Sequence, residues 1–375
     1  MVKSLAFRGL AASIATMTAP VAFAQYGLNM PVGVTEISRE VYDLHMLIFW
    51  ICCVIGVAVF GVMAYSIVKH RKSKGHAAAH FHESTSVEIA WTVVPFLILV
   101  GMAIPAAKTL IAMEDTSAAD LTIKVTGYQW KWEYEYMDGP AKGLSFFSNL
   151  STPREQIENR AAKGEHYLLE VDNPVVVPVG KKVRFLLTSN DVIHAWWVPD
   201  LAVKKDAVPG FINEMWTRIE LPGTYRGQCA ELCGKDHGFM PVVVVAKDDV
   251  GWMDWAAEQN AARAALANAA DRAWSKDELI AKGEAVYQTN CAACHQANGQ
   301  GVPGVFPGIT GGPISTGPIA GHIEIVMNGK AGTAMQAFGK QLSDVDLAAV
   351  VSYQRNGLGN SVGDFVEPQA IKSLR

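Results

Sequence analysis

The stretch from Gln228 to Met240 reads QCAELCGKDHGFM and gathers several soft metal ligands in one short segment. Two thiols, an imidazole and a thioether suit copper, and the Cys-x3-Cys spacing differs from that of the usual zinc knuckle. One blue-copper ion needs a single cysteine, two histidines and a weak axial methionine, whereas a second cysteine lets both sulfurs bridge two metal ions. The segment therefore predicts a copper site, and two copper ions fit it better than one. Its soft ligands are Cys229, Cys233, His237 and Met240.

The second histidine of such a site must come from elsewhere in the chain. His194 in SNDVIHAWWVPDL follows a segment that we predict to be a strand, and the end of a barrel could bring it beside the cysteine segment. A single histidine is more often structural than a metal ligand, so the structural alternative for His194 remains open.

A second chemical motif, CAACH, spans Cys291 to His295. It is the covalent attachment motif for haem c, in which Cys291 and Cys294 form thioethers and His295 is the proximal iron ligand. Haem attachment takes place outside the cytoplasm, which agrees with an exported chain.

The sixth iron ligand is expected to be a methionine on a downstream loop. Met335 in GTAMQAFGKQLSD fits this expectation. Met327 lies in the helical pattern HIEIVMNGK and is expected to pack in the core, and His322 is the alternative ligand.

Two apolar runs, 44–68 and 89–113, are long enough as helices to cross a hydrocarbon core of ~30 Å. Four basic residues follow the first run and acidic residues follow the second, so the positive-inside rule places the connecting loop in the cytoplasm and everything after residue 114 outside. The first residues have the pattern of a secretory signal cleaved before Gln25. The basic residues are Lys69, Arg71, Lys72 and Lys74.

From Leu121 to about Ala246 the pattern is that of strands: LTIKVTGYQWKWEYEY, HYLLEV, VVVPVGKKVRFLLTS, EMWTRIEL and MPVVVVA, separated by turn signals. Many short strands without intervening helices predict a Greek-key sandwich or barrel. The aromatic residues of GYQWKWEYEY fall at every second position, so in one strand they would share a face. Residues 139–165 are expected to form a surface insertion.

The remaining chain contains an alanine-rich segment and a small domain. The segment lacks a broad apolar face, which suits a solvated helical linker, and the small domain opens and closes with amphipathic helices. The predicted divisions are a signal peptide (1–24), an N-terminal segment with the two spans (25–120), a copper domain (121–250), the linker (251–274) and a haem domain (275–375).

The segments DVIHAWWVPDLAVKKDAVPG and GTYRGQCAELCGKDHGFMPVVV, after a two-helix membrane hairpin, resemble subunit II of the haem-copper cytochrome c oxidases over roughly residues 30–250. In that family an outer cupredoxin domain holds the binuclear Cu(A) centre. The resemblance implies that Cys229 and Cys233 bridge two copper ions. It further implies His194 and Met240 on one ion, and His237 with the backbone carbonyl of Glu231 on the other.

The same resemblance implies roles for three other groups. Trp130 corresponds to the tryptophan at the surface where an electron is received. The side chain of Glu231 would help to bind a Mg²⁺ or Mn²⁺ ion shared with subunit I. Glu88 matches the glutamate at the cytoplasmic mouth of a proton pathway, although Thr85 to Glu88 also reads as a capping box for the second membrane helix, which alone would explain the residue.

The haem segment, with the GTAM loop and the closing helix, resembles a class I cytochrome c over about residues 276–360. That likeness implies a carbonyl acceptor at Pro307 for the proximal imidazole, and a close helix crossing at Gly283 near Tyr353. The expected fold is therefore multidomain: a two-helix transmembrane hairpin, an all-β cupredoxin-like Greek-key barrel and a small all-α cytochrome c domain.

Taken together, these features predict subunit II of a respiratory cytochrome c oxidase in a bacterial inner membrane, with its copper and haem domains on the periplasmic side. The expected partners are subunit I, subunit III and a cytochrome c donor, with no nucleic acid. The chain has no membrane histidine cluster for an oxygen-reducing site. The alternative is a membrane-tethered copper and haem electron carrier that is not part of an oxidase.

Overall fold

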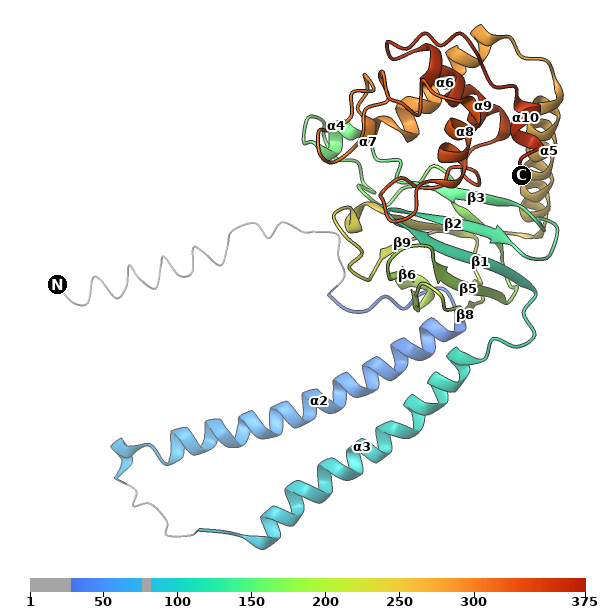
Figure 1. The fold of residues 1–375 in the computed structure, drawn as a ribbon. Coiled ribbons are helices and arrows are strands. Elements are labelled where there is room, and N and C mark those ends of the chain that lie inside the picture. The colour runs from blue at the N-terminus through green and yellow to red at the C-terminus, as the bar shows by residue number, and fades with distance from the viewer. Residues whose placement is uncertain (1–27, 76–81) are drawn as a thin grey trace. The chain divides into compact units, whose positions relative to one another are not determined.

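The computed structural model describes residues 28–75 and 82–375 (Figure 1). The predicted signal peptide, 1–24, lies outside the described residues. The chain divides into two compact units: Met1–Ala112 with Pro199–Ala202, and Met113–Val198 with Val203–Arg375. Each unit is described by itself.

The first unit contains two long helices, α2 (Glu36–Lys69) and α3 (Thr85–Glu114). Thr35 and Ser38 form a reciprocal capping box that starts α2, and α3 includes Pro95 and Pro105. Both helices are long and apolar enough to cross a membrane by length and composition. Each helix contains one of the two predicted apolar runs and extends beyond it at both ends.

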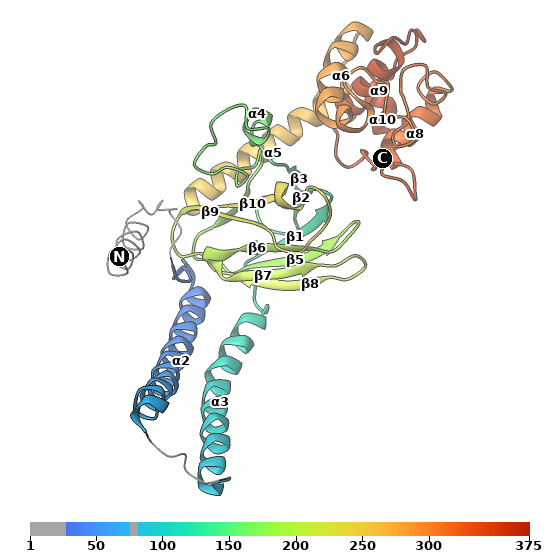
Figure 2. The same cartoon turned by 90° about the vertical axis from the view of Figure 1, so that its left-hand side faces the viewer.

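The β-rich part of the second unit consists of two five-stranded sheets, in the strand orders β3-β2-β1-β5-β8 and β4-β10-β9-β6-β7 (Figure 2). The pairs β1 with β5 and β4 with β10 are parallel, and the other pairs are antiparallel. This is the predicted all-β sandwich. The strands are β1 (Leu121–Tyr128), β2 (Lys131–Tyr136), β3 (Ser145–Ser148), β4 (Val175–Pro178), β5 (Val183–Ser189), β6 (His194–Val198), β7 (Val203–Ala207), β8 (Asn213–Thr217), β9 (Gly223–Cys229) and β10 (Pro241–Lys247).

The run LTIKVTGYQWKWEYEY is a hairpin, so the prediction of one continuous strand is wrong. Tyr128 at the end of β1 pairs with Lys131 at the start of β2, and Gln129 and Trp130 form the connection. The predicted aromatic face holds within β2, where Trp132, Tyr134 and Tyr136 are fully buried. Trp130 lies outside that face, because the connection is held by hydrogen bonds to other parts of the fold.

Two other predictions for this region need correction. HYLLEV forms no strand, and Val171 makes only an isolated bridge to Leu150. The expected insertion, 139–165, contains β3, which pairs with β2 and extends the sheet. His194 follows β5, which ends at Ser189, as predicted, and it is also the first residue of β6.

Helix α5 (Asp249–Asp271) occupies the alanine-rich segment. It is not solvated throughout, because Trp252 and Ala256 are buried near its start and Ala270 near its end. The ring of Trp252 lies 5.9 Å from that of Tyr136, so the helix is anchored to the β-sandwich. Packing of this kind is not visible in a composition dominated by alanine.

The last part of the chain is helical, as predicted. Its core lies between α6 and α9, which bury Leu279, Tyr287, Leu347 and Val350. The helices are α6 (Lys276–Asn290), α7 (Ala292–His295), α8 (Ile319–Asn328), α9 (Asp344–Asn356) and α10 (Pro368–Lys372). A further short helix, α4 (Arg154–Ile157), lies in the β-rich part.

Gly283 is the point of closest approach between α6 and α9. A Cβ atom placed there would lie 2.1 Å from the carbonyl oxygen of Ala349 and 2.7 Å from Cβ of Tyr353. This agrees with the close crossing that the likeness to cytochrome c implied. The two helices can touch because the glycine has no side chain.

Replacing Gly283 with alanine is expected to destabilise the helical domain by about 1 to 3 kcal/mol, because the helices must move apart. Thermal unfolding of the purified chain measures the effect. Gly321→Ala in α8 is the matched control, since a Cβ there has no atom within 4 Å. Equal unfolding temperatures for the two variants would contradict the close crossing.

Candidate metal centre

Six groups that the sequence suggested as copper ligands lie together at one end of the β-sandwich. Sγ of Cys229 is 3.8 Å from Sγ of Cys233, 3.9 Å from Nδ1 of His194 and 3.4 Å from the carbonyl oxygen of Glu231. Sγ of Cys233 is 3.5 Å from Nδ1 of His237 and 3.5 Å from Sδ of Met240. The two sulfurs are therefore the shared centre of the cluster.

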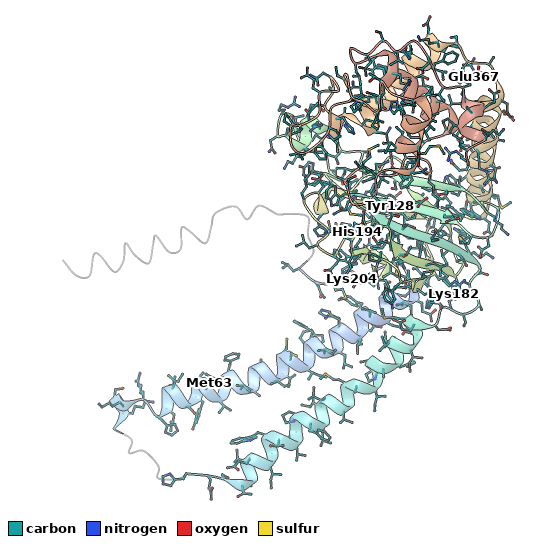
Figure 3. The ribbon with its side chains drawn as sticks, in the orientation of Figure 1. Met63, Tyr128, Lys182, His194, Lys204 and Glu367 are labelled. Carbon is teal, nitrogen blue, oxygen red and sulfur yellow. The ribbon has the colours of Figure 1, made fainter. Side chains whose placement is uncertain are left out.

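The strands fix where these groups meet. Cys229 ends β9 and Met240 directly precedes β10, and Gln228 pairs with Pro241 across these antiparallel strands. The segment between them, which carries Cys233 and His237, is thus the loop of a hairpin. β6 pairs with β9 in the same sheet, which brings His194 to the loop (Figure 3).

Burial and charge distinguish the two thiols. His194, Cys229, Cys233 and Met240 are each at most 3% exposed. Burial alone would raise the pKa of Cys229, but hydrogen bonds with His194 and nearby backbone groups lower it to about 7. Burial and the neighbouring Cys229 sulfur raise the pKa of Cys233 to about 12. Ionisation of the Cys229 thiol is thus favoured, and ionisation of the Cys233 thiol beside it is opposed.

Asp191 supports His194 from the side away from the sulfurs, and the sequence interpretation missed it. Its Oδ1 lies 2.9 Å from Nε2 of His194, and its Oδ2 accepts a hydrogen bond from the backbone N–H of Gln129 at 2.7 Å. Burial would lower the pKa of His194, but the Asp191 carboxylate and Cys229 raise it to about 9. The acidic residue three positions before the histidine in DVIH was the available signal.

The space for the His194 ring depends on a glycine in β1. A Cβ on Gly127 would lie 2.7 Å from Cδ2 of His194. The ring also packs edge-on against Trp132, with centroids 5.8 Å apart. Its orientation is thus fixed by packing as well as by Asp191.

Trp130 and Gln129 contact the cysteine loop through one carbonyl. Nε1 of Trp130 donates to the carbonyl oxygen of Cys233 at 3.1 Å, and Nε2 of Gln129 donates to the same oxygen at 2.9 Å. Trp130 is half-buried. It therefore links the partly exposed hairpin connection directly to the backbone of a candidate ligand.

The CAACH motif lies at the end of α6 and in α7. Nδ1 of His295 lies 2.8 Å from the carbonyl oxygen of Pro307. A carbonyl oxygen can only accept, so Nδ1 carries the hydrogen and Nε2 keeps its lone pair for a metal. Cys291 is buried, Cys294 is half-buried, and both thiols are free. The two thiols and the free Nε2 of His295 fit a covalently attached haem.

The three candidates for the sixth position differ in their surroundings. Met335 is half-buried in the segment between α8 and α9. Met327 lies in α8 and packs against the hydrophobic core. His322, also in α8, is 3% exposed, and its Nε2 is engaged at 2.7 Å with Oε1 of Gln354.

Glu88 is exposed in the first turn of α3. Its backbone N–H donates to the carbonyl oxygen of Ser84, and Thr85 is already the first helical residue. The predicted capping box requires Thr85 to precede the helix as its N-cap. Thr85 lies inside the helix, so this prediction is wrong by one residue.

Three known protein families match consecutive parts of the chain. Residues 24–109 match the family described as cytochrome C oxidase subunit II, transmembrane domain, and residues 121–247 match the periplasmic domain of that subunit. Residues 278–353 match the family described as cytochrome C oxidase, cbb3-type, subunit III.

Individual relatives agree with these matches. The probable cytochrome c oxidase subunit 2 of Rickettsia prowazekii is 40% identical over 245 residues, which cover 64% of this chain and 74% of the relative. The mitochondrial cytochrome c oxidase subunit 2 of Vigna unguiculata is 40% identical over 229 residues, 60% of each chain. The periplasmic domain of subunit II of cytochrome oxidase from Bradyrhizobium japonicum is 41% identical, with a TM-score of 0.35, and the match covers 39% of this chain and 96% of that one.

Proposed function

Because the chain belongs to the cytochrome c oxidase subunit II family, we propose that it receives electrons from a cytochrome c and delivers them to the oxygen-reducing subunit I, coupled to proton translocation. The family match makes it a membrane-anchored oxidase subunit with a periplasmic domain, and its two matched domain types imply Cu(A) and haem. The inner membrane of a bacterium is the proposed location, and subunit III is a proposed further partner.

The observation that carries the proposal is the meeting of six donor groups around two buried sulfurs. We assign Cys229 and Cys233 as bridging ligands, with His194, Met240, His237 and the carbonyl of Glu231 completing the set. Held by these residues, a copper pair would supply a one-electron couple. The sulfur ligands Cys229, Cys233 and Met240 are buried, and the full set of donors would leave no position for a substrate.

Metal analysis with electron paramagnetic resonance of the purified chain tests this assignment. About two copper ions per chain and a spectrum of one electron shared by both ions are expected. Copper clearly below two per chain, or the spectrum of one localised Cu(II), would contradict it. Co-purification with subunit I separates an oxidase from the rival, a tethered electron carrier, which predicts the chain alone.

Asp191→Ala is expected to lower copper affinity about 10- to 100-fold, because outer hydrogen-bond partners orient histidine ligands. Copper retention during titration with a chelator measures this. Asp206→Ala, in the neighbouring strand β7, is the control, since Asp206 is exposed. Unchanged retention in Asp191→Ala would show that packing alone orients His194.

We further propose that Cys291 and Cys294 attach haem c, with His295 and Met335 as iron ligands. A haem with histidine and methionine ligands supplies a one-electron couple of raised potential. The hydrogen bond between His295 and the Pro307 carbonyl supports this role, because it fixes the tautomer. Trp130 is proposed to lie where the copper centre receives electrons, supported by its hydrogen bond to the Cys233 carbonyl.

Two acidic residues complete the proposal. The carboxylate of Glu231 is exposed and is available for a Mg²⁺ or Mn²⁺ ion shared with subunit I, which must supply further oxygen ligands. Glu88 is proposed to admit protons at the cytoplasmic side.

Glu88→Gln is expected to reduce oxygen consumption of the assembled oxidase severalfold while copper and haem contents stay normal, because glutamine cannot carry a proton. Glu83→Gln, five residues earlier, is the control. If both variants retain full oxygen consumption, Glu88 has no role in proton uptake.

A further inference from the structure

Three buried polar side chains form a chain of contacts behind the first cysteine of CAACH. His322 in α8, Gln354 in α9 and Cys291 are 3%, 4% and 8% exposed. Nε2 of His322 lies 2.7 Å from Oε1 of Gln354, and Nε2 of Gln354 lies 3.8 Å from Sγ of Cys291. Two separate helices thus contribute to the surroundings of one sulfur atom.

The hydrogen bonds among these three side chains run in one direction, from His322 to Gln354 and from Gln354 to Cys291. The amide oxygen of Gln354 can only accept, so Nε2 of His322 carries the hydrogen. Burial lowers the pKa of His322 to about 4, with smaller opposing effects of Gln354 and Asp364 and a further lowering by Arg355, so the ring is neutral at pH 7. Among the described residues, none offers a hydrogen-bond partner to its Nδ1. His322 therefore acts here as a donor only, and it turns the amide NH₂ of Gln354 toward the sulfur.

That direction matters because the sulfur changes its chemistry on attachment. A free thiol can donate its hydrogen to an amide oxygen, whereas a thioether has no hydrogen and can only accept. The orientation that His322 imposes on Gln354 therefore suits the thioether. Cys294 has a different setting: among the described residues, no side chain forms a hydrogen bond with its sulfur.

We propose that His322 and Gln354 are positioning residues that hold Sγ of Cys291 toward a haem vinyl group and donate a hydrogen bond to the thioether that results. This rests on the proposed attachment of haem c at CAACH. In the attachment step the C–S bond forms at one vinyl carbon, the thiol hydrogen moves to the other, and the vinyl π bond is lost. No external oxidant or reductant enters this balance.

The rival explanation is that the His322 and Gln354 pair only ties α8 to α9. A purely structural contact would affect both thioethers equally, through the stability of the domain. A positioning contact affects the bond at Cys291 and leaves that at Cys294 in place. Which cysteine remains unreacted therefore separates the two explanations.

The test uses the full chain matured with haem, as wild type and as the Gln354→Leu and His322→Leu variants. Mass spectrometry of the haem peptide gives the fraction of Cys291 and of Cys294 that is attached. The α band of the pyridine haemochrome separately reports whether one vinyl group is unreacted. Asn356→Leu is the matched control, because it removes an amide from α9 that bonds Ser352 and Asp364 and has no contact with Cys291.

We expect both variants to raise the fraction of chains with unattached Cys291 at least severalfold, with Cys294 attached as in wild type and Asn356→Leu unchanged. Wild-type attachment at both cysteines in Gln354→Leu would overturn the proposal. Equal loss of both thioethers, together with a fall in thermal stability, would also overturn it. A wild-type chain without covalent haem would instead contradict the proposed function.

Discussion

Replacing Cys233 with serine should abolish oxygen consumption by the assembled oxidase. Its sulfur lies near three other candidate donors, at 3.8 Å from Sγ of Cys229 and 3.5 Å from both Nδ1 of His237 and Sδ of Met240. A serine hydroxyl is a hard ligand that replaces a soft thiolate poorly at a copper site. Copper content should therefore fall from about two ions per chain to one or none.

Oxygen uptake, copper content and the electron paramagnetic resonance spectrum measure the effect on one preparation. Cys52→Ser in α2 makes the same chemical change outside the metal centre and serves as the control. Subunit I should co-purify with both variants, because Cys233 lies in the loop between β9 and β10 and not in a strand of the sandwich. Full oxygen uptake with Cys233→Ser would remove the basis of the proposed function.

Replacing Met335 with leucine is expected to leave haem covalently bound but to lower its reduction potential by at least ~0.1 V, within the range of ~0.8 V that axial ligands span. Leucine keeps the apolar volume and removes the sulfur that would favour reduced iron. Electron transfer from an external cytochrome c should slow accordingly. A redox titration followed by the haem absorbance measures the potential.

Met327→Leu is the matched control, since it changes the same atoms in a methionine that packs in the core from α8. Its haem should keep the potential of the wild type. If instead Met327→Leu lowers the potential and Met335→Leu does not, the two methionines have been assigned the wrong way round.

Candidate ligands that are close in sequence could be proposed together because their spacing is itself the signal. Four of the six candidate copper donors lie between β9 and β10, and the strand pairing that closes this loop brings them together. His194 was harder, because its position depends on the pairing of β6 with β9, which no local pattern reveals. Its identification came from the resemblance of DVIHAWWVPDL to a known family.

The connection at Gln129 and Trp130 was missed for a physical reason. The alternation of aromatic residues continues through it, so local periodicity predicts one strand. The backbone N–H of Gln129 donates to the Asp191 carboxylate and Nε1 of Trp130 donates to the Cys233 carbonyl, and these acceptors, which are distant in sequence, fix the turn there. Tertiary contacts of this kind override a local pattern, and they also explain why Asp191 was not recognised.

The helical domain was more predictable, with one exception. Gly283 could be assigned to a helix crossing from the likeness to cytochrome c, and the structure agrees, because a Cβ added there would lie only 2.1 Å from the carbonyl oxygen of Ala349. The burial of Trp252 and Ala270 in α5 was not predicted, because a composition rich in alanine says little about partners.

The hairpin of β9 and β10 has a consequence for assembly in the periplasm. Gln228 and Pro241 pair at the base of the ligand loop, and Val244 in β10 pairs with both Tyr225 in β9 and Val175 in β4. The framework around the loop is therefore made of backbone pairing that needs no metal. On the proposed copper centre, this framework would already surround the loop when copper binds.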